Sequence, residues 1–145
     1  MTIVSNSSPI ISLARIRRLD MMRSLLGRIA ITPTVKLETL GQCPASDEAV
    51  HIREAFDSFF DIVEPQTKPH FSRSLDDGEK SVIALALELN ASLVLLDDKK
   101  AIKEAREFKL APVSTRDIVF EAEVRGIVSS ANSIIKQLSD CGVFI

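Results

Sequence analysis

Two apolar runs in this sequence end directly in polar side chains. Asn6 follows the run at residues 2–4, and Asp97 and Asp98 follow the run at residues 92–96. The carboxyl ends of parallel strands meet at one edge of a sheet, where α/β proteins bind their ligands. If the two runs are neighbouring parallel strands, an amide and two carboxylates lie together at that edge.

Two glutamates extend this set. Glu79 lies in the first turn of an apolar helix expected over residues 76–89, and Glu38 lies one turn into a helix expected from Thr34. Carboxylates packed together raise each other's pKa, so such a cluster persists chiefly where a hard divalent cation neutralises it. All-oxygen ligand sets favour Mg²⁺ or Mn²⁺. The candidate metal ligands are therefore Glu38, Glu79, Asp97 and Asp98.

Each acid also has a structural interpretation. Asp76 and Glu79 have the spacing of a capping box, and acids at a helix start suit the helix dipole. Asp97 or Asp98 can cap the helix that follows, and Glu38 alone can be a solvated helix residue. No single acid decides between these interpretations, whereas their convergence on one sheet edge favours a site.

Strands and helices alternate along the chain in short steps. The expected strands are residues 2–4, 28–31, 59–63, 92–96 and 111–113. The expected helices begin at Pro9 after a Ser8 cap, at Leu19, at Thr34 (closing at Gly41), and at residues 47, 76 and 99; two more, separated by Gly126, follow a Thr115 cap. This alternation implies parallel pairing with right-handed crossovers. It predicts a three-layer α/β/α sandwich with a central, mostly parallel sheet.

Composition narrows the class of protein. With 145 residues, of which 46% are hydrophobic, the chain is expected to form one domain over residues 1–145. A net charge of −2 argues against binding nucleic acid through bulk positive charge, although an acidic metal site lowers the net charge by itself. Cys43 and Cys141 lack metal-ligand spacing, and we find no signal peptide or membrane span. We therefore expect a soluble cytoplasmic protein with no membrane association.

The order of these motifs resembles the PIN-domain family of metal-dependent ribonucleases, to which the toxins of many prokaryotic toxin–antitoxin pairs belong. The motifs that carry the resemblance are NSSPIISL at residues 6–13, GEKSVIALAL at 78–87, LLDD at 95–98, and Ser114-Thr115 followed by Gly126-Ile127. The resemblance extends from Ile3 to about Gly142, nearly the whole chain. It implies a PIN-like fold.

The resemblance also implies roles for particular residues. The family's acidic positions fall on Asn6, Glu38, Glu79 and Asp97, or on Asp98 if the last motif is shifted by one residue. Ser7 matches the hydroxyl beside the first acid. The segment after Thr115 places Asp117 as a further, outer acid, with first-turn dipole stabilisation as its structural alternative. Asn6 departs from the family pattern, because an amide oxygen lacks the charge that a hard cation prefers.

The function implied is that of a Mg²⁺- or Mn²⁺-dependent ribonuclease, the toxin of a pair with a small antitoxin protein; homodimers are common in such families. Lys99 and Lys103 lie on one helix face and would position the RNA backbone, unless that face is simply solvated. Two alternatives stay open. One is a catalytically silent PIN-like module that binds RNA or protein, favoured by Asn6. The other is a magnesium-dependent phosphoacceptor domain, although Asn6-Ser7 stands where receiver domains carry an acidic pair.

Overall fold

A five-stranded, all-parallel sheet forms the centre of the computed structural model, which describes residues 1–42 and 46–145. The spatial order of the strands is β3-β2-β1-β4-β5. Their bounds are β1 Ile3–Ser5, β2 Ile29–Ile31, β3 Phe60–Ile62, β4 Leu93–Leu95 and β5 Pro112–Val113. Every expected strand is present, each trimmed or shifted at its ends.

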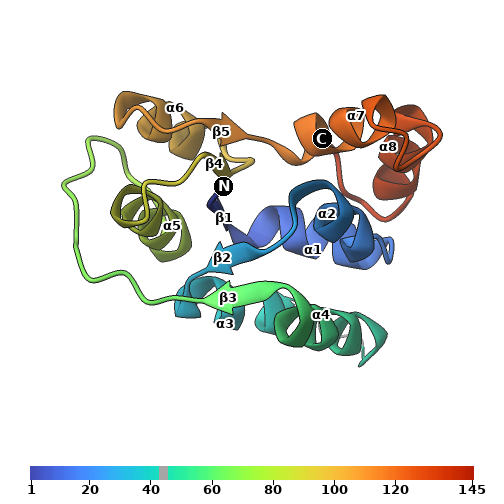
Figure 1. The fold of residues 1–145 in the computed structure, drawn as a ribbon, viewed down its shortest axis with the longest axis horizontal. Coiled ribbons are helices and arrows are strands. Elements are labelled where there is room, and N and C mark those ends of the chain that lie inside the picture. The colour runs from blue at the N-terminus through green and yellow to red at the C-terminus, as the bar shows by residue number, and fades with distance from the viewer. Residues whose placement is uncertain (43–45) are drawn as a thin grey trace.

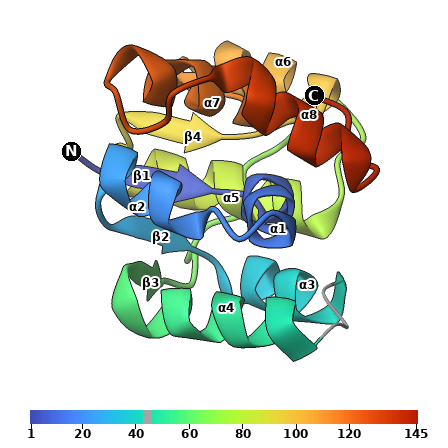
Figure 2. The same ribbon diagram turned by 90° about the vertical axis from the view of Figure 1, so that its right-hand side faces the viewer.

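Helices cover both faces of this sheet, and the predicted three-layer α/β/α sandwich is confirmed. Figure 2 shows α2 and α4 in front of the sheet and α5 behind it, and Figure 1 shows the same layers from the side. The helices of the described residues are α1 Ser7–Arg15, α2 Leu19–Leu26, α3 Pro33–Gln42, α4 Ser46–Ser58, α5 Asp77–Glu88, α6 Lys99–Glu107, α7 Thr115–Val124 and α8 Ala131–Asp140. No helix within these residues combines the length and the apolar character needed to cross a bilayer.

The central strand β1 brings the two halves of the chain together. It pairs with β2 on one side and with β4 on the other, with Val4 opposite both Ala30 and Val94. Strands buried on both faces need continuous apolar runs, as these strands have. The pairing continues one residue beyond β1, because the Asn6 amide donates to the Leu95 carbonyl at 3.0 Å. The end of β1 therefore lies beside the end of β4.

The start of α1 differs from the prediction. Asn6, not Ser8, is the N-cap residue, and its side chain makes no capping hydrogen bond. Ser8 lies inside the helix and donates its hydroxyl to Asp97 at 2.8 Å. Pro9 is accepted at the third helical position because first-turn N–H groups have no intrahelical partner. The predicted Ser8 cap with Pro9 at the first helical position is therefore wrong.

Two further helix ends were predicted wrongly. Ser114, not Thr115, caps α7, and Thr115 is its buried first residue. Gly41 does not close α3, which continues to Gln42. Gly41 lacks the positive φ angle that a glycine stop uses, and the helix continues past it.

Residues 63–76 form a long segment without helix or strand, which we call the arch. It runs outside α5 at the left of Figure 1. Glu88 of α5 accepts the backbone amides of Gln66 and Thr67, both at 2.9–3.0 Å. This irregular segment is therefore held in place by the Glu88 side chain of the helix that follows it. Of the two cysteines, Cys141 is exposed and Cys43 lies outside the described residues.

Candidate functional site

A pocket of about 450 Å³ lies at the carboxyl edge of the sheet, where β1 and β4 end. Four acids line it: Glu38, Asp76, Glu79 and Asp98. Asn6, Ser7 and Ser8 at the start of α1 also line it, together with Arg15 at the end of that helix. The structure thus brings together five predicted site residues, namely Asn6, Ser7, Glu38, Glu79 and Asp98.

Two oxygens of this pocket are buried without a hydrogen-bond partner among the described residues. They are Oδ1 of Asn6 and Oε1 of Glu38. The Asn6 residue is only 6% exposed. Leaving a buried acceptor unpaired costs on the order of 1–3 kcal/mol. Both oxygens are free to accept a contact from a ligand, and such a contact would recover that cost.

Glu79 both caps a helix and lines the pocket. It forms the predicted capping box with Asp76, because its amide donates to Asp76 Oδ1 at 2.8 Å and its Oε1 accepts from the Asp76 amide at 3.0 Å. The box occupies one oxygen of each carboxyl group with backbone amides. The helix cap therefore fixes both carboxylates at the pocket wall, where each keeps a second oxygen.

The neighbouring acids Asp97 and Asp98 have different surroundings. Asp98 lines the pocket and caps α6, where Oδ2 accepts from the Ala101 amide at 3.1 Å. Asp97 accepts from the Ser8 hydroxyl at 2.8 Å and from both the amide and the hydroxyl of Thr115 at 2.7 Å. Asp98 is therefore the acid at the pocket, and Asp97 joins the starts of α1 and α7.

Burial and neighbouring charge perturb the two glutamates. Burial, and then the charges of Asp76 and Asp77, raise the pKa of Glu38. Burial also raises the pKa of Glu79, opposed by its hydrogen bond from the Asp76 amide and reinforced by the charges of Asp76, Asp98 and Glu38. Burial is the larger cause of both shifts, and repulsion from the neighbouring acids adds to it. A cation would stabilise the ionised pocket.

The donor set fits a hard divalent cation in its chemistry. All lining acids and Asn6 offer oxygen, the ligand atom that Mg²⁺ and Mn²⁺ prefer, and two of these oxygens are buried and unpaired. Among residues 1–42 and 46–145, however, no three His, Cys, Asp or Glu side chains are grouped closely enough to hold an ion together. Mg²⁺ often takes only one or two carboxylates and keeps several waters, which this spacing permits.

The remaining predicted residues lie outside the pocket. Lys99 and Lys103 are exposed on α6 and do not line it. Asp117 lies in the first turn of α7, as its structural alternative expects, and it also accepts from the Ser114 amide at 2.9 Å in a capping box. Thr115 contacts Asp97 rather than the pocket.

The pocket also includes a basic residue that sequence reasoning missed. Arg15 lines it, and its side chain is exposed. The sequence spacing could have indicated Arg15. Ser8, Ser12 and Arg15 stand at positions i, i+4 and i+7, so they lie on one face of α1.

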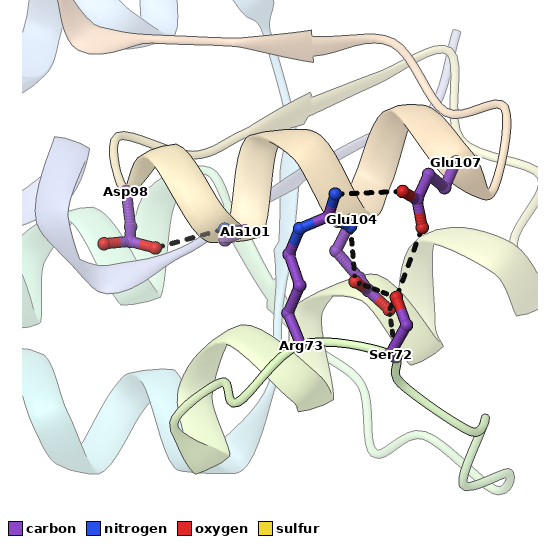
Figure 3. Close-up of polar contacts among 6 residues, drawn as sticks. All are labelled: Ser72, Arg73, Asp98, Ala101, Glu104 and Glu107. Atoms are coloured by element: carbon purple, nitrogen blue, oxygen red, sulfur yellow. Dashed lines mark hydrogen bonds and ion pairs between the residues drawn. The ribbon is translucent and has the colours of Figure 1, made fainter.

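A second group of acids lies at the far end of α6 (Figure 3). Glu104 is 2% exposed and accepts from the Ser72 amide at 2.8 Å and from Arg73 at 2.9 Å. Burial opposes its ionisation, but the hydrogen bonds from Ser72 and Arg73 outweigh burial, so its pKa is lowered. Arg73 also pairs with Glu107 at 2.9 Å. This group anchors the arch to α6, whereas Asp98 at the other end of that helix faces the pocket.

Comparisons with known proteins agree with this architecture. A solved structure of a PilT N-terminus domain protein, SSO1118 from the hyperthermophilic archaeon Sulfolobus solfataricus P2, superposes with a TM-score of 0.60 at 20% identity. The match covers 84% of this chain and 93% of that one, and at this identity it shows a shared fold. No curated protein sequence matches the chain. The model of the DUF3368 family, described as a PIN domain, matches residues 2–145. The chain therefore belongs to the PIN-domain family, which generally includes nucleases.

Proposed function

We propose that this chain is a Mg²⁺- or Mn²⁺-dependent ribonuclease acting at the pocket where β1 and β4 end. One observation carries the proposal: two buried, unpaired oxygens, Oδ1 of Asn6 and Oε1 of Glu38, lie in a pocket lined by further carboxylates. A cation ligand would satisfy those oxygens and offset the repulsion among the acids. Family membership supports phosphodiester hydrolysis as the reaction class, because PIN domains generally include nucleases.

Each pocket residue has a role in this proposal. Glu38, Glu79 and Asp98 would hold the ion directly or through water, with Asn6 as a neutral oxygen ligand. Such an ion would supply charge neutralisation for the scissile phosphate and would lower the pKa of a water bound to it. Ser7 is available to orient a ligand at the pocket wall, and Arg15 offers a guanidinium that matches phosphate geometry. Asp97 organises the helix starts around the pocket instead of binding metal.

We further propose that the protein is a cytoplasmic toxin whose partner is a small antitoxin, and that residues 1–145 form one domain. Family membership is what supports this role. A small gene directly upstream encoding a DNA-binding fold would agree with it, and its product should bind this chain on co-expression. Absence of such a gene, with no growth defect on expression, would leave a nuclease outside any toxin–antitoxin pair.

The experiment that tests the nuclease compares wild type with Glu79→Gln and Glu54→Gln. A glutamine at 79 keeps an oxygen for the capping box but removes the charge. Glu54 is exposed on α4 and does not line the pocket, so its variant removes the same charge elsewhere. Mn²⁺ affinity, measured by calorimetry, and cleavage of a mixed RNA pool should each fall at least tenfold in Glu79→Gln only, on the order of 1.4 kcal/mol. Equal binding and cleavage by all three proteins would reject the metal-dependent nuclease.

A catalytically silent module that binds RNA or protein is the second candidate. Asn6 favours it, because the amide removes one charge from the pocket, and so does the lack of three closely grouped ligands in the described part of the chain. RNA binding in EDTA without cleavage in Mn²⁺, by wild type and Asn6→Asp alike, would support the silent module over the nuclease.

A further inference from the structure

Gly78 lies at the second position of α5, directly before Glu79. A β-carbon built on Gly78 would overlap Oε1 of Glu38 and lie 2.9 Å from its carboxyl carbon and 3.1 Å from Oε2. Contacts of this kind force a shift of the carboxyl group or of the backbone. The Glu38 carboxyl group therefore occupies the space that any side chain at position 78 would need.

Backbone conformation does not explain this glycine. Gly27, Gly126 and Gly142 adopt positive φ angles, which favour glycine, whereas Gly78 does not. Gly41 is the other helical glycine without a positive φ angle, and a β-carbon there would meet nothing within 4 Å. A helical glycine is unfavourable relative to alanine, so position 78 accepts a cost that its backbone angles do not require. The approach of Glu38 is the physical reason for it.

The contact also explains how Glu38 reaches the pocket. Its carboxyl group lies against the first turn of α5, whose dipole favours a negative charge. The same turn fixes Glu79 through the capping box with Asp76. The start of α5 thus holds two pocket acids by different means: a hydrogen-bonded cap for Glu79 and a missing side chain for Glu38.

We propose that Gly78 is a positioning residue, whose lack of a side chain seats the Glu38 carboxyl group at the pocket, where it can serve a cation. The cation part of this inference rests on the proposed function, while the seating of Glu38 does not. Replacing Gly78 with alanine should displace Glu38 and leave the capping box of Glu79 formed.

A stability cycle on the metal-free protein tests the seating. Gly41→Ala is the matched control and should raise the melting temperature by about 2 °C, as alanine does in an open helix position. Gly78→Ala should raise the melting temperature by less in the wild-type background, where it must displace Glu38, than in the Glu38→Ala background, where the space is empty. A rise of the same size in both backgrounds would overturn the inference.

Mn²⁺ calorimetry tests the consequence for the site. Gly78→Ala should bind Mn²⁺ at least tenfold more weakly than wild type, whereas Gly41→Ala should bind normally. Shortening the acid with Glu38→Asp in the Gly78→Ala protein should recover part of the affinity. If Glu38→Ala weakens binding and Gly78→Ala does not, the positioning role is wrong and the proposed function stands. If wild type binds no Mn²⁺, the proposed function fails, and the stability cycle alone decides whether Gly78 seats Glu38.

Discussion

Asp97 and Thr115 are joined by two hydrogen bonds, from the Thr115 amide to Oδ1 and from its hydroxyl to Oδ2, each 2.7 Å long. The Ser8 hydroxyl completes the set at 2.8 Å. Asp97→Ala should therefore lower the free energy of unfolding by about 3 kcal/mol, because it leaves these donors unpaired. Thr115→Val removes only the hydroxyl bond and should cost about 1 kcal/mol. Urea unfolding measures both values; Mn²⁺ affinity should stay within twofold of wild type, and a larger loss would show that Asp97 is a ligand after all.

Two variants of Asp98 should separate its role as the cap of α6 from its role as a pocket charge. Asparagine caps helices as well as aspartate does, so Asp98→Asn should keep the stability of α6 while it removes a pocket charge. Asp98→Ala loses the cap as well, which costs about 1 kcal/mol. We expect both variants to weaken Mn²⁺ binding in calorimetry and only the alanine variant to melt earlier. Unchanged Mn²⁺ affinity in both would reduce Asp98 to a cap.

Asn6→Asp should restore the missing pocket charge. The change is nearly isosteric, and the Asn6 side chain makes no capping bond that could be lost. With Mn²⁺ present, the variant should bind metal more tightly and cleave RNA about tenfold faster, which needs ~1.4 kcal/mol of added transition-state stabilisation. In EDTA it should melt earlier than wild type, because another negative charge joins the acids. If Asn6→Asp cleaves RNA and melts as the wild type does, both in Mn²⁺ and in EDTA, then Asn6 is only a residue of the strand-to-helix turn.

The raised pKa values of Glu38 and Glu79 predict how stability depends on pH without metal. A carboxyl group with a raised pKa holds its proton more tightly in the folded protein than in the unfolded chain. Its contribution to stability therefore falls as the pH rises from the ordinary value of 4.5 through the raised value. Glu88 and Glu104 have lowered pKa values and act in the opposite sense, losing stability as the pH falls.

Differences between variants isolate the two pocket acids. In EDTA, Glu38→Gln and Glu79→Gln should each gain stability relative to wild type as the pH increases above 4.5, and saturating Mn²⁺ should abolish the gain. The measurement is urea unfolding from pH 4 to pH 8. Differences that do not change with pH would mean that neither glutamate is perturbed.

Releasing the arch from α6 should not affect metal binding at the pocket. Glu104→Gln places an amide NH₂ group against the donors of Ser72 and Arg73 and should cost on the order of 3 kcal/mol. The freed arch should then be cut by trypsin after Arg73, with Mn²⁺ affinity unchanged. Glu107→Gln is the control, because Glu107 is exposed and its ion pair should contribute at most about 1 kcal/mol. Resistance of Glu104→Gln to trypsin would show that other contacts hold the arch.

Sequence reasoning located the central strands because strands buried on both faces leave short apolar runs, as at residues 93–96. The edge strand β3 keeps a weaker signal, because Asp61 interrupts its apolar residues. It located Glu38, Glu79 and Asn6 at the pocket through their positions relative to those runs and through the family motifs. It did not choose between Asp97 and Asp98. That choice depends on Ser8 and Thr115, which lie far away in the chain and meet Asp97 only after folding.

Other features had no local signal. Glu104 lies in a strongly charged helix, where an acid is expected to be solvated, yet it is buried by partners in the arch. Leu37 has the apolar character of a core residue and is 73% exposed, because α3 turns Glu38 rather than Leu37 toward its neighbours. In both cases tertiary packing decided a question that helical periodicity left ambiguous.

The position of β1 has a consequence during synthesis. The first three strands leave the ribosome before β4 exists, so one edge of β1 has no neighbour until the second half of the chain is made. An open, apolar strand edge is a template for wrong pairing with another chain. Closing it requires Ile3 to meet Leu93, a contact across a long loop that forms slowly. The nascent protein therefore exposes an unpaired strand edge that is prone to aggregation. The pairing of β4 with β1 covers that edge and also brings Asp98 close to Asn6.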